Sequence, residues 1–163
     1  MRKAVFLDRD GVLNRERGVH TWTLEAFEVL PDVPAALKAL QEDGRALVVI
    51  TNQSGIGLGM YGHADVETLH GYLHGMLAEH GVSLTAVYYC PHHPSRGKCL
   101  CRKPGGLLLE RAIARYRLDP ENSVMIGDRT RDMEAASSVG VRGILVESNS
   151  NLLQVVLNEV LNA

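Results

Sequence analysis

Short apolar runs alternate with amphipathic segments along the whole chain. Continuous apolar runs are typical of strands that are buried on both faces of a sheet, and they predict strands at residues 4–7, 46–50, 86–89, 123–126 and 143–146. Apolar residues at helical spacing predict helices at residues 34–43, 65–80, 107–116, 133–138 and 152–161. Because strands and helices alternate, we expect a three-layer, Rossmann-like α/β fold, in which helices cover both faces of a parallel sheet.

The connections between the predicted strands leave no room for a second domain. Between Asp10 and Thr51 the chain has space for one loop and one helix. Between Thr51 and Lys103 it has space for a helix, a strand and a cysteine-containing loop. We therefore expect a single domain over residues 1–163, with no cap domain above its site.

The composition is typical of a globular protein, with 45% hydrophobic and 22% charged residues. The formal net charge of −2 gives no reason to expect nucleic-acid binding. No apolar run reaches the length of a membrane span, and Met1-Arg2-Lys3 leads directly into a strand instead of a signal peptide. We expect a cytoplasmic protein without nucleic-acid or membrane partners, and a monomer is the simplest expectation.

Pairs of polar residues follow the predicted strands. They are Asp8 and Asp10, Thr51 and Asn52, Arg102 and Lys103, and Asp128 and Asp132. The carboxyl ends of parallel strands share one edge of a sheet, where open α/β folds bind ligands. An isolated Asp-x-Asp is more often a solvated turn, but the convergence of all these groups on one edge predicts a functional site.

Carboxylates dominate this predicted site, and oxygen ligands are those that Mg²⁺ prefers. Asp8 and Asp128 would supply carboxylates to the ion, and Asp10 a backbone carbonyl. Asp132 lies four residues after Asp128, about one helical turn away. It would either orient the ligands from behind or simply interact with the dipole at a helix N-terminus.

The same residues suit the hydrolysis of a phosphate monoester in two steps. Asp8 would attack phosphorus and become an aspartyl-phosphate. Asp10 would protonate the leaving alcohol and then deprotonate the water that hydrolyses the intermediate. Thr51 and Lys103 would bind the oxygens of the transferring phosphoryl group.

The three cysteines, Cys90, Cys99 and Cys101, all lie in one short stretch that also contains His92 and His93. An odd, clustered set of cysteines favours metal binding over disulfide bonds. Three thiolates and one imidazole match a closed, four-coordinate structural zinc site. Ordinary buried thiols are the alternative, and the spacing leaves either histidine available as the fourth ligand.

Four motifs together resemble the haloacid dehalogenase (HAD) superfamily of aspartyl phosphatases. They are Asp8-Arg9-Asp10-Gly11, Thr51-Asn52, Lys103, and Gly127-Asp128 with Asp132. Within that superfamily the chain, from Val5 to about Val146, is most similar to the D-glycero-D-manno-heptose 1,7-bisphosphate phosphatases. These share ancestry with the histidinol-phosphate phosphatases.

The resemblance implies a HAD-like fold, Mg²⁺ dependence and a role for each motif residue. It makes Asp8 the nucleophile, Asp10 the proton donor, and Thr51 and Lys103 the groups that stabilise the phosphoryl group. Both phosphatase families carry a zinc-binding Cys/His loop, which implies that the ligands here are Cys90, His92, Cys99 and Cys101. Zinc in this loop would help to aim Arg102 and Lys103.

The resemblance also implies a substrate, because Asn14 and Gln53-Ser54 match the heptose group better than the histidinol group. The implied reaction removes one phosphate from D-glycero-D-manno-heptose 1,7-bisphosphate. Candidate substrate contacts are Asn52, Gln53, Ser54, Arg102, Arg129, Glu16 and Arg17. One alternative is a phosphatase for histidinol phosphate or another small phosphomonoester. The other is a zinc-stabilised binding protein without turnover.

Overall fold

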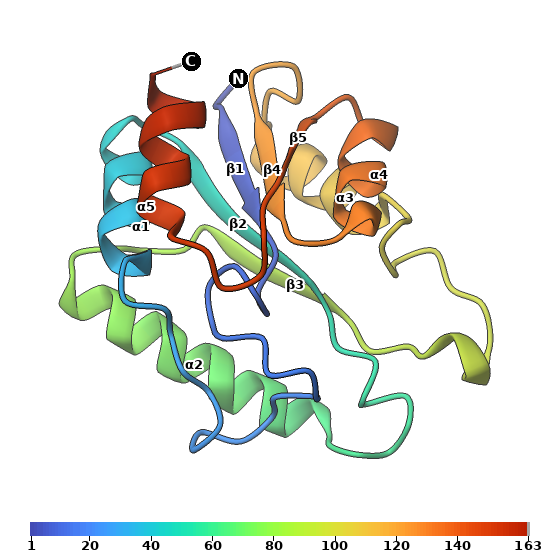
Figure 1. Cartoon of the computed structure of the whole chain (residues 1–163). Helices are drawn as coiled ribbons and strands as arrows, with labels where there is room; N and C mark the ends of the chain where they lie inside the picture. The colour runs from blue at the N-terminus through green and yellow to red at the C-terminus, as the bar shows by residue number, and fades with distance from the viewer. Residues whose placement is uncertain (163) are drawn as a thin grey trace.

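The computed structural model describes residues 1–162, which form a five-stranded sheet with every strand parallel to its neighbours (Figure 1). The strands are β1 (Ala4–Leu7), β2 (Ala46–Asn52), β3 (Ala86–Cys90), β4 (Val124–Gly127) and β5 (Arg142–Leu145). Their order in the sheet is β3-β2-β1-β4-β5. The winding therefore reverses at β1, and this reversal opens a crevice at the carboxyl ends of β1 and its neighbours.

Helices cover both faces of the sheet, which confirms the three-layer fold (Figure 1). They are α1 (Val33–Glu42), α2 (His63–Glu79), α3 (Leu107–Tyr116), α4 (Thr130–Ser138) and α5 (Leu152–Val155), with a 3-10 turn η1 (Pro94–Arg96) and a π-helical segment η2 (Val156–Leu161). Helices α1, α2 and α5 pack on one face, and α3 and α4 pack on the other.

Strand β1 shows why the apolar runs form the centre of the sheet. Val5 and Leu7 pack into the layer of α1, α2 and α5, while Ala4 and Phe6 pack into the layer of α3 and α4. All four side chains are fully buried, as the continuous apolar run predicts. Burial of a side chain as large as Phe6 or Leu7 stabilises the fold by roughly 1.5–3 kcal/mol.

Most predicted boundaries lie within two residues of the structure, and the larger differences are in two helices. Helix α4 begins at Thr130, three residues before the predicted start. The reason is a cap: the Asp132 carboxylate accepts a hydrogen bond from the backbone N–H of Arg129, and this closes the first turn. The predicted helix over 152–161 is α-helical only to Val155 and continues as a π-helix. Among residues 1–162, no helix combines the length and apolar character that a membrane span requires.

Candidate active site

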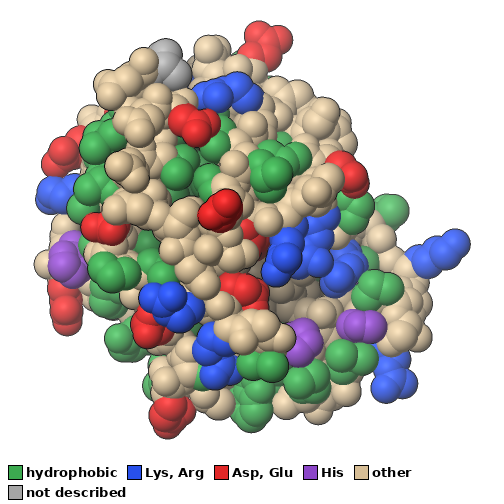
Figure 2. Space-filling view, viewed as in Figure 1, with side chains coloured by type: hydrophobic (Ala, Val, Ile, Leu, Met, Phe, Trp, Pro, Cys, Tyr) green, Lys and Arg blue, Asp and Glu red, His purple; other side chains and the backbone are tan. Residues whose placement is uncertain are grey.

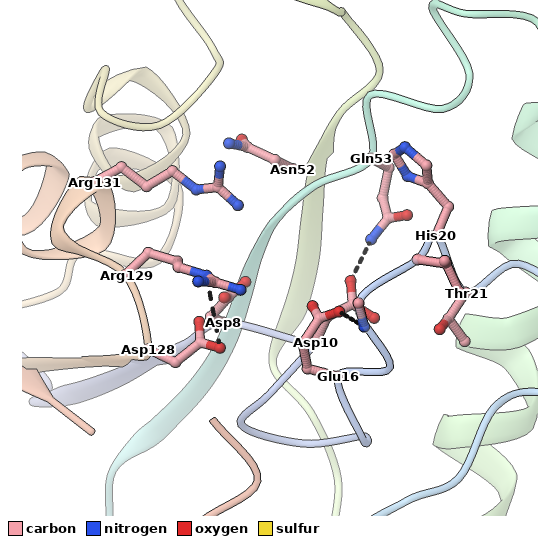
Figure 3. A pocket seen from close by; sticks show the side chains of 12 residues that line it. Asp8, Asp10, Glu16, His20, Thr21, Asn52, Gln53, Asp128, Arg129 and Arg131 are labelled. Atoms are coloured by element: carbon pink, nitrogen blue, oxygen red, sulfur yellow. Dashed lines mark hydrogen bonds and ion pairs between the residues drawn. The ribbon is translucent and has the colours of Figure 1, made fainter. Parts of the chain in front are cut away.

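The polar groups predicted to meet at one edge of the sheet do meet there. Strand β1 lies between β2 and β4, so the segments that follow these three strands are neighbours. They surround a cavity of about 260 Å³. Its lining residues are Asp8, Asp10, Glu16, Gly18, Val19, His20, Thr21, Asn52, Gln53, Asp128, Arg129 and Arg131. Figure 3 shows Arg129 and Arg131 on one side, His20 and Thr21 on the other, and the carboxylates of Asp8, Asp10 and Glu16 between them.

Lys103 lies beneath the cavity, where it joins two carboxylates. Its Nζ atom is 2.9 Å from Asp8 Oδ1 and 2.7 Å from Asp132 Oδ1, and it also donates to the Ile50 carbonyl at 2.7 Å. Burial alone would lower the pKa of Lys103, but the two carboxylates raise it above its ordinary value. The side chain is therefore a fixed ammonium group, and Asp132 holds it from the side away from the cavity.

Asp8 and Asp128 give the site more negative charge than one lysine balances. Burial, together with the charges of Asp132 and Asp10, raises the pKa of Asp8 to about 7 against the lowering effect of Lys103. Carboxylate oxygens of Asp8, Asp128 and Asp132 all lie within 4.8 Å of one another. This donor set suits a hard divalent cation such as Mg²⁺, which takes oxygen ligands and relieves the crowded charge.

Gly11 permits the close approach of β1 and β4 at this point. Its φ is +89°, a conformation that glycine adopts without strain, and a Cβ atom there would overlap the Asp128 carboxylate. The Asp128 side chain is 1% exposed and accepts a hydrogen bond from Ser148 Oγ at 2.6 Å. The glycine of the Asp8-Arg9-Asp10-Gly11 motif therefore makes room for the carboxylate that faces Asp8.

Asp10 has a different environment, although it lies only two residues from Asp8. Its Oδ1 accepts hydrogen bonds from Arg9 Nη2 and Asn14 Nδ2, each at 2.9 Å, and its Oδ2 accepts one from Gln53 Nε2 at 3.1 Å. Burial raises the pKa of Asp10, but the Arg9 charge and these donors outweigh it and hold the pKa below its usual value. The pKa values of Asp8 and Asp10 are therefore shifted in opposite directions, which is typical of paired carboxylates that have different catalytic roles.

Arg9 is fully buried and connects Asp10 to two other parts of the chain. Besides Asp10, Nη2 donates to the Thr21 carbonyl at 2.9 Å, and Nη1 lies 3.4 Å from His70 Nε2 on α2. The guanidinium carbon also lies 5.4 Å from the centre of the Phe27 ring. Nothing in the sequence pattern predicted the burial of this charged residue.

We expect His70 to make the protein less stable in acid. Burial, together with the charges of Arg9 and His74, lowers the pKa of His70 to about 4 against the small opposing effect of Asp10. In the unfolded chain this histidine has an ordinary pKa of about 6.5, so it binds a proton at pH values where the folded chain does not. Stability therefore falls as the pH drops from about 6.5 toward 4. Between pH 7 and pH 5 the loss is roughly 2 kcal/mol.

Urea unfolding of the wild type and of His70→Gln at both pH values measures this loss. The free energy of unfolding should fall less in the variant, by roughly 2 kcal/mol, because glutamine does not titrate. His80→Gln is the matched control, since His80 is exposed at the end of the same helix and does not contribute to the pKa shift of His70, and it should keep the wild-type slope. Equal slopes in wild type and His70→Gln would contradict the burial of a neutral His70.

Some residues predicted from the sequence do not line the cavity. Thr51 is 1% exposed, and its hydroxyl accepts a hydrogen bond from Gln53 Nε2 at 3.0 Å. Arg17 bonds within its own loop, to Thr21 Oγ1 at 3.3 Å and to the His20 carbonyl at 3.4 Å. Ser54 and Arg102 also lie outside the lining set.

Asn52 both lines the cavity and holds the next segment of the site. Its Oδ1 accepts a hydrogen bond from the Lys103 backbone N–H at 3.1 Å, and its Nδ2 donates to the Lys103 carbonyl at 3.3 Å. This pair of bonds fixes the Lys103 backbone against the end of β2. The amide of Asn52 therefore positions the lysine as well as facing the cavity.

Arginines gather on one side of the cavity, and one of them was not predicted. Arg129 and Arg131 line it. Arg102 lies near Arg131, and burial together with the Arg131 charge lowers the pKa of Arg102. Arg102 Nη1 and Arg131 Nε are buried without a hydrogen-bond partner among residues 1–162. Figure 2 shows Lys and Arg side chains gathered beside a hollow with acidic groups next to them. Unpaired guanidinium groups of this kind suit a bound anion.

The loop over residues 16–21 lies on the opposite side of the cavity. Of its residues, only Glu16 and Arg17 were predicted as substrate contacts. The Glu16 backbone N–H donates to Asn149 Oδ1 at 2.7 Å, and Asn149 Nδ2 returns a bond to the Glu16 carbonyl at 3.1 Å. His20 and Thr21 line the cavity and were not predicted. Arg131 could have been predicted as a lining residue, because it lies at the start of a helix beside Asp128. The irregular loop gave no comparable sequence signal for His20 and Thr21.

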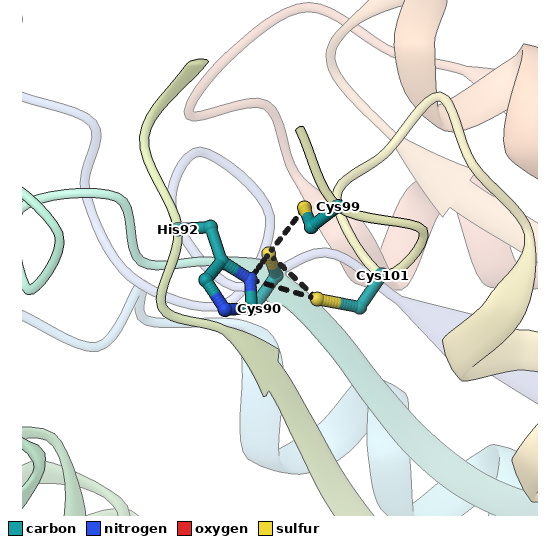
Figure 4. Close-up of side chains that lie close together, drawn as sticks. All are labelled: Cys90, His92, Cys99 and Cys101. Atoms are coloured by element: carbon teal, nitrogen blue, oxygen red, sulfur yellow. Dashed lines mark hydrogen bonds between the residues drawn. The ribbon is translucent and has the colours of Figure 1, made fainter. Parts of the chain in front are cut away.

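Figure 4 shows the four predicted metal ligands gathered together at the end of β3. Cys90 Sγ lies 3.0 Å from Cys101 Sγ and 3.7 Å from Cys99 Sγ, and His92 Nδ1 lies 3.2 Å from Cys101 Sγ. His93 is turned away and bonds to Ser95 Oγ at 2.7 Å. Three sulfurs and one nitrogen around a common point suit a tetrahedral zinc site that keeps no open position.

Comparison with known proteins gives the chain a family. A HAD-hydrolase-like family model matches residues 100–157. The D-glycero-beta-D-manno-heptose-1,7-bisphosphate 7-phosphatase of Haemophilus ducreyi is 41% identical over 147 residues, which cover 86% of this chain and 80% of that protein. The protein of the same name from Escherichia coli K12 is also 41% identical, over 85% of this chain and 75% of that protein.

Solved structures agree with these relatives. The D,D-heptose 1,7-bisphosphate phosphatase of B. bronchiseptica, in complex with magnesium and phosphate, has a TM-score of 0.85 and 30% identity over 97% of this chain and 88% of that chain. The corresponding Burkholderia thailandensis structure has a TM-score of 0.67 and 26% identity, and covers 98% and 87%. On its sequence, its fold and the residues gathered at its sheet edge, this chain belongs to the heptose-bisphosphate phosphatase family of HAD-like hydrolases.

Proposed function

We propose that the protein removes the 7-phosphate from D-glycero-β-D-manno-heptose 1,7-bisphosphate, with Mg²⁺ as its cofactor. The observation that supports this most directly is the buried group in which Lys103 joins Asp8 and Asp132, with Asp128 facing Asp8. The names of the relatives supply the substrate and the phosphate that is removed. The magnesium and phosphate in the B. bronchiseptica structure support the cofactor and the ligand class.

In the proposed reaction Asp8 is the nucleophile. A carboxylate oxygen of Asp8 forms a bond to phosphorus while the bond from phosphorus to the sugar oxygen breaks, and the departing oxygen takes a proton from Asp10. Water then attacks phosphorus, Asp10 takes a proton from that water, and the bond to Asp8 breaks. Lys103 keeps its positive charge beside the reacting oxygens throughout. The Thr51 hydroxyl, which accepts a hydrogen bond from Gln53, would rearrange to donate one to a phosphoryl oxygen.

Asp8 and Asp128 would hold the ion with their carboxylates and Asp10 with its backbone carbonyl, while Asp132 keeps Lys103 in place. Mg²⁺, when bound, neutralises phosphate charge so that an anionic nucleophile can approach. The pKa of Asp10 is low in the absence of ligand, and an arriving dianionic phosphate raises it. With this higher pKa, Asp10 can carry the proton that it donates to the leaving oxygen in the first step.

The second phosphate of the substrate needs its own anchor. Arg129 and Arg131 line the side of the cavity away from the loop over 16–21. Arg102 lies close enough to Arg131 for the two charges to interact. We propose that these guanidinium groups bind the phosphate that is kept, because Arg102 and Arg131 each have a buried nitrogen without a partner among residues 1–162. Asn52, Gln53 and Glu16 would contact the sugar from the remaining walls.

We further propose that Cys90, His92, Cys99 and Cys101 bind a structural zinc ion. Thiolate ligands persist in a reducing compartment, which favours the cytoplasm. We propose that the chain forms a single domain and acts there as a monomer.

A phosphate-release screen with Mg²⁺ tests the proposed function. The panel is the α and β anomers of the heptose bisphosphate, fructose 1,6-bisphosphate and histidinol phosphate, with loss of the 7-phosphate followed by ³¹P NMR. We expect the highest kcat/KM for the β anomer. A preference for histidinol phosphate would replace this substrate with the alternative. Failure to hydrolyse any member of the panel would favour the zinc-stabilised binding protein.

A further inference from the structure

We propose that Arg9, held by His70, is a positioning residue that fixes the Asp10 carboxylate and links it to the loop over residues 16–21. This inference rests on the proposed function, because it assigns Asp10 the proton transfers. It concerns a residue that lies inside the Asp8-Arg9-Asp10 motif but faces away from the reacting atoms. Neither Arg9 nor His70 lines the cavity.

The guanidinium group of Arg9 has partners in three separate parts of the fold. One nitrogen, Nη2, donates both to Asp10 Oδ1 and to the Thr21 carbonyl, each at 2.9 Å. The other, Nη1, faces His70 Nε2 at 3.4 Å, and the guanidinium carbon lies over the Phe27 ring. Because a single nitrogen holds both Asp10 and Thr21, any movement of Arg9 displaces the carboxylate and the loop together.

His70 can only accept in this contact, which fixes its chemical form. Arginine has donors but no acceptor, so Nε2 of His70 must be unprotonated and Nδ1 must carry the proton. Burial and the neighbouring positive charge of Arg9 both favour this neutral form. His70 is 6% exposed, and its ring meets the edge of Tyr89 at 5.9 Å between centroids. The imidazole is therefore a rigid acceptor fixed to α2.

The position of Asp10 matters most when the leaving group is basic. An alkoxide cannot leave without a proton, so cleavage of an alkyl phosphate needs the Asp10 carboxyl group at the departing oxygen. p-Nitrophenolate is stable as an anion and leaves without that proton. A displaced Asp10 should therefore slow the hydrolysis of alkyl phosphates much more than that of aryl phosphates.

The test compares kcat/KM for fructose 1,6-bisphosphate and for p-nitrophenyl phosphate in full-length protein with Mg²⁺. This ratio reports the phosphoryl transfer to Asp8 and not the later hydrolysis. In Arg9→Met and His70→Leu, we expect kcat/KM for the sugar phosphate to fall by roughly 100-fold, and that for the aryl phosphate by less than about tenfold. His70→Gln restores an acceptor for Arg9 and should recover most of the loss. His74→Leu is the exposed control on the same helix.

Equal losses on the two substrates would mean that Arg9 and His70 act only on folding or binding, and would overturn the inference. So would wild-type kinetics in Arg9→Met or His70→Leu. Nitrogen-15 NMR of His70 provides a readout that does not depend on activity or on the stability of any variant. We expect an unprotonated Nε2 and a protonated Nδ1 in the wild type. A protonated Nε2 would overturn the inference, whereas an inactive wild type with the expected tautomer would contradict the proposed function alone.

Discussion

Asp8→Asn should abolish phosphate release while leaving the protein folded. An amide cannot form the aspartyl-phosphate, so we expect kcat to fall by at least about 10⁴-fold, or roughly 5.5 kcal/mol in the barrier. The fold should lose nothing, because burial makes the Asp8 carboxylate a poorly placed charge whose pKa rises to about 7. Lys103 also keeps its ion pair with Asp132 at 2.7 Å. We therefore expect the melting temperature without metal to be unchanged or higher than that of the wild type.

Phosphate release and thermal melting, each measured with and without Mg²⁺, check this result. Mg²⁺ should raise the melting temperature of the wild type more than that of Asp8→Asn, because the variant has one fewer anionic ligand. Asp32→Asn is the matched control: it makes the same chemical change at the start of α1, where the side chain forms no capping bond. Turnover by Asp8→Asn near the wild-type rate would remove the nucleophile from the proposed mechanism.

Cys101→Ser should abolish the proposed zinc binding and destabilise the protein. Cys101 Sγ lies within 3.0 Å of Cys90 Sγ and 3.2 Å of His92 Nδ1, so its loss opens the proposed coordination sphere. We expect a loss of more than about 4 kcal/mol in the free energy of unfolding, which is roughly 10 °C or more in melting temperature for a chain of this size. Activity should fall as well, because Lys103 follows only two residues later.

Elemental analysis of the purified protein gives the first measurement, with one zinc per chain expected in the wild type and little in Cys101→Ser. His93→Asn serves as the control, since His93 faces Ser95 and asparagine can accept the same backbone hydrogen bond. It should retain zinc, stability and turnover. Wild-type protein free of zinc, or loss of the metal in His93→Asn alone, would show that the ligand set is wrong.

The sequence predicted most of the fold because each buried strand is a continuous apolar run. Once β1 lies between β2 and β4, the polar residues after these strands must meet, so Asp8, Asn52 and Asp128 were predictable as a group. The early start of α4 was harder to predict, because it depends on a hydrogen bond from the Arg129 backbone N–H to the Asp132 side chain. The pattern of apolar residues carries no trace of such a cap.

The parts that the sequence missed depend on contacts between distant segments. Arg9 reads as an exposed charge between two acids, yet it is buried against His70, which is 61 positions away in the chain. The loop over residues 16–21 is held by Asn149, 133 positions from Glu16. Neither pairing follows from periodicity or local turn chemistry, since both exist only after the helices have packed on the sheet.

The shared hold on Lys103 has a consequence for the whole reaction cycle. In the proposed mechanism, phosphorylation of Asp8 converts that carboxylate into an acyl phosphate, a mixed anhydride, while the ion pair of Lys103 with Asp132 and its bond to the Ile50 carbonyl persist. The ammonium group thus keeps its place while its other neighbour changes chemically. The Lys103 ammonium group would therefore be in place for both half-reactions, and it would not have to reorient between them.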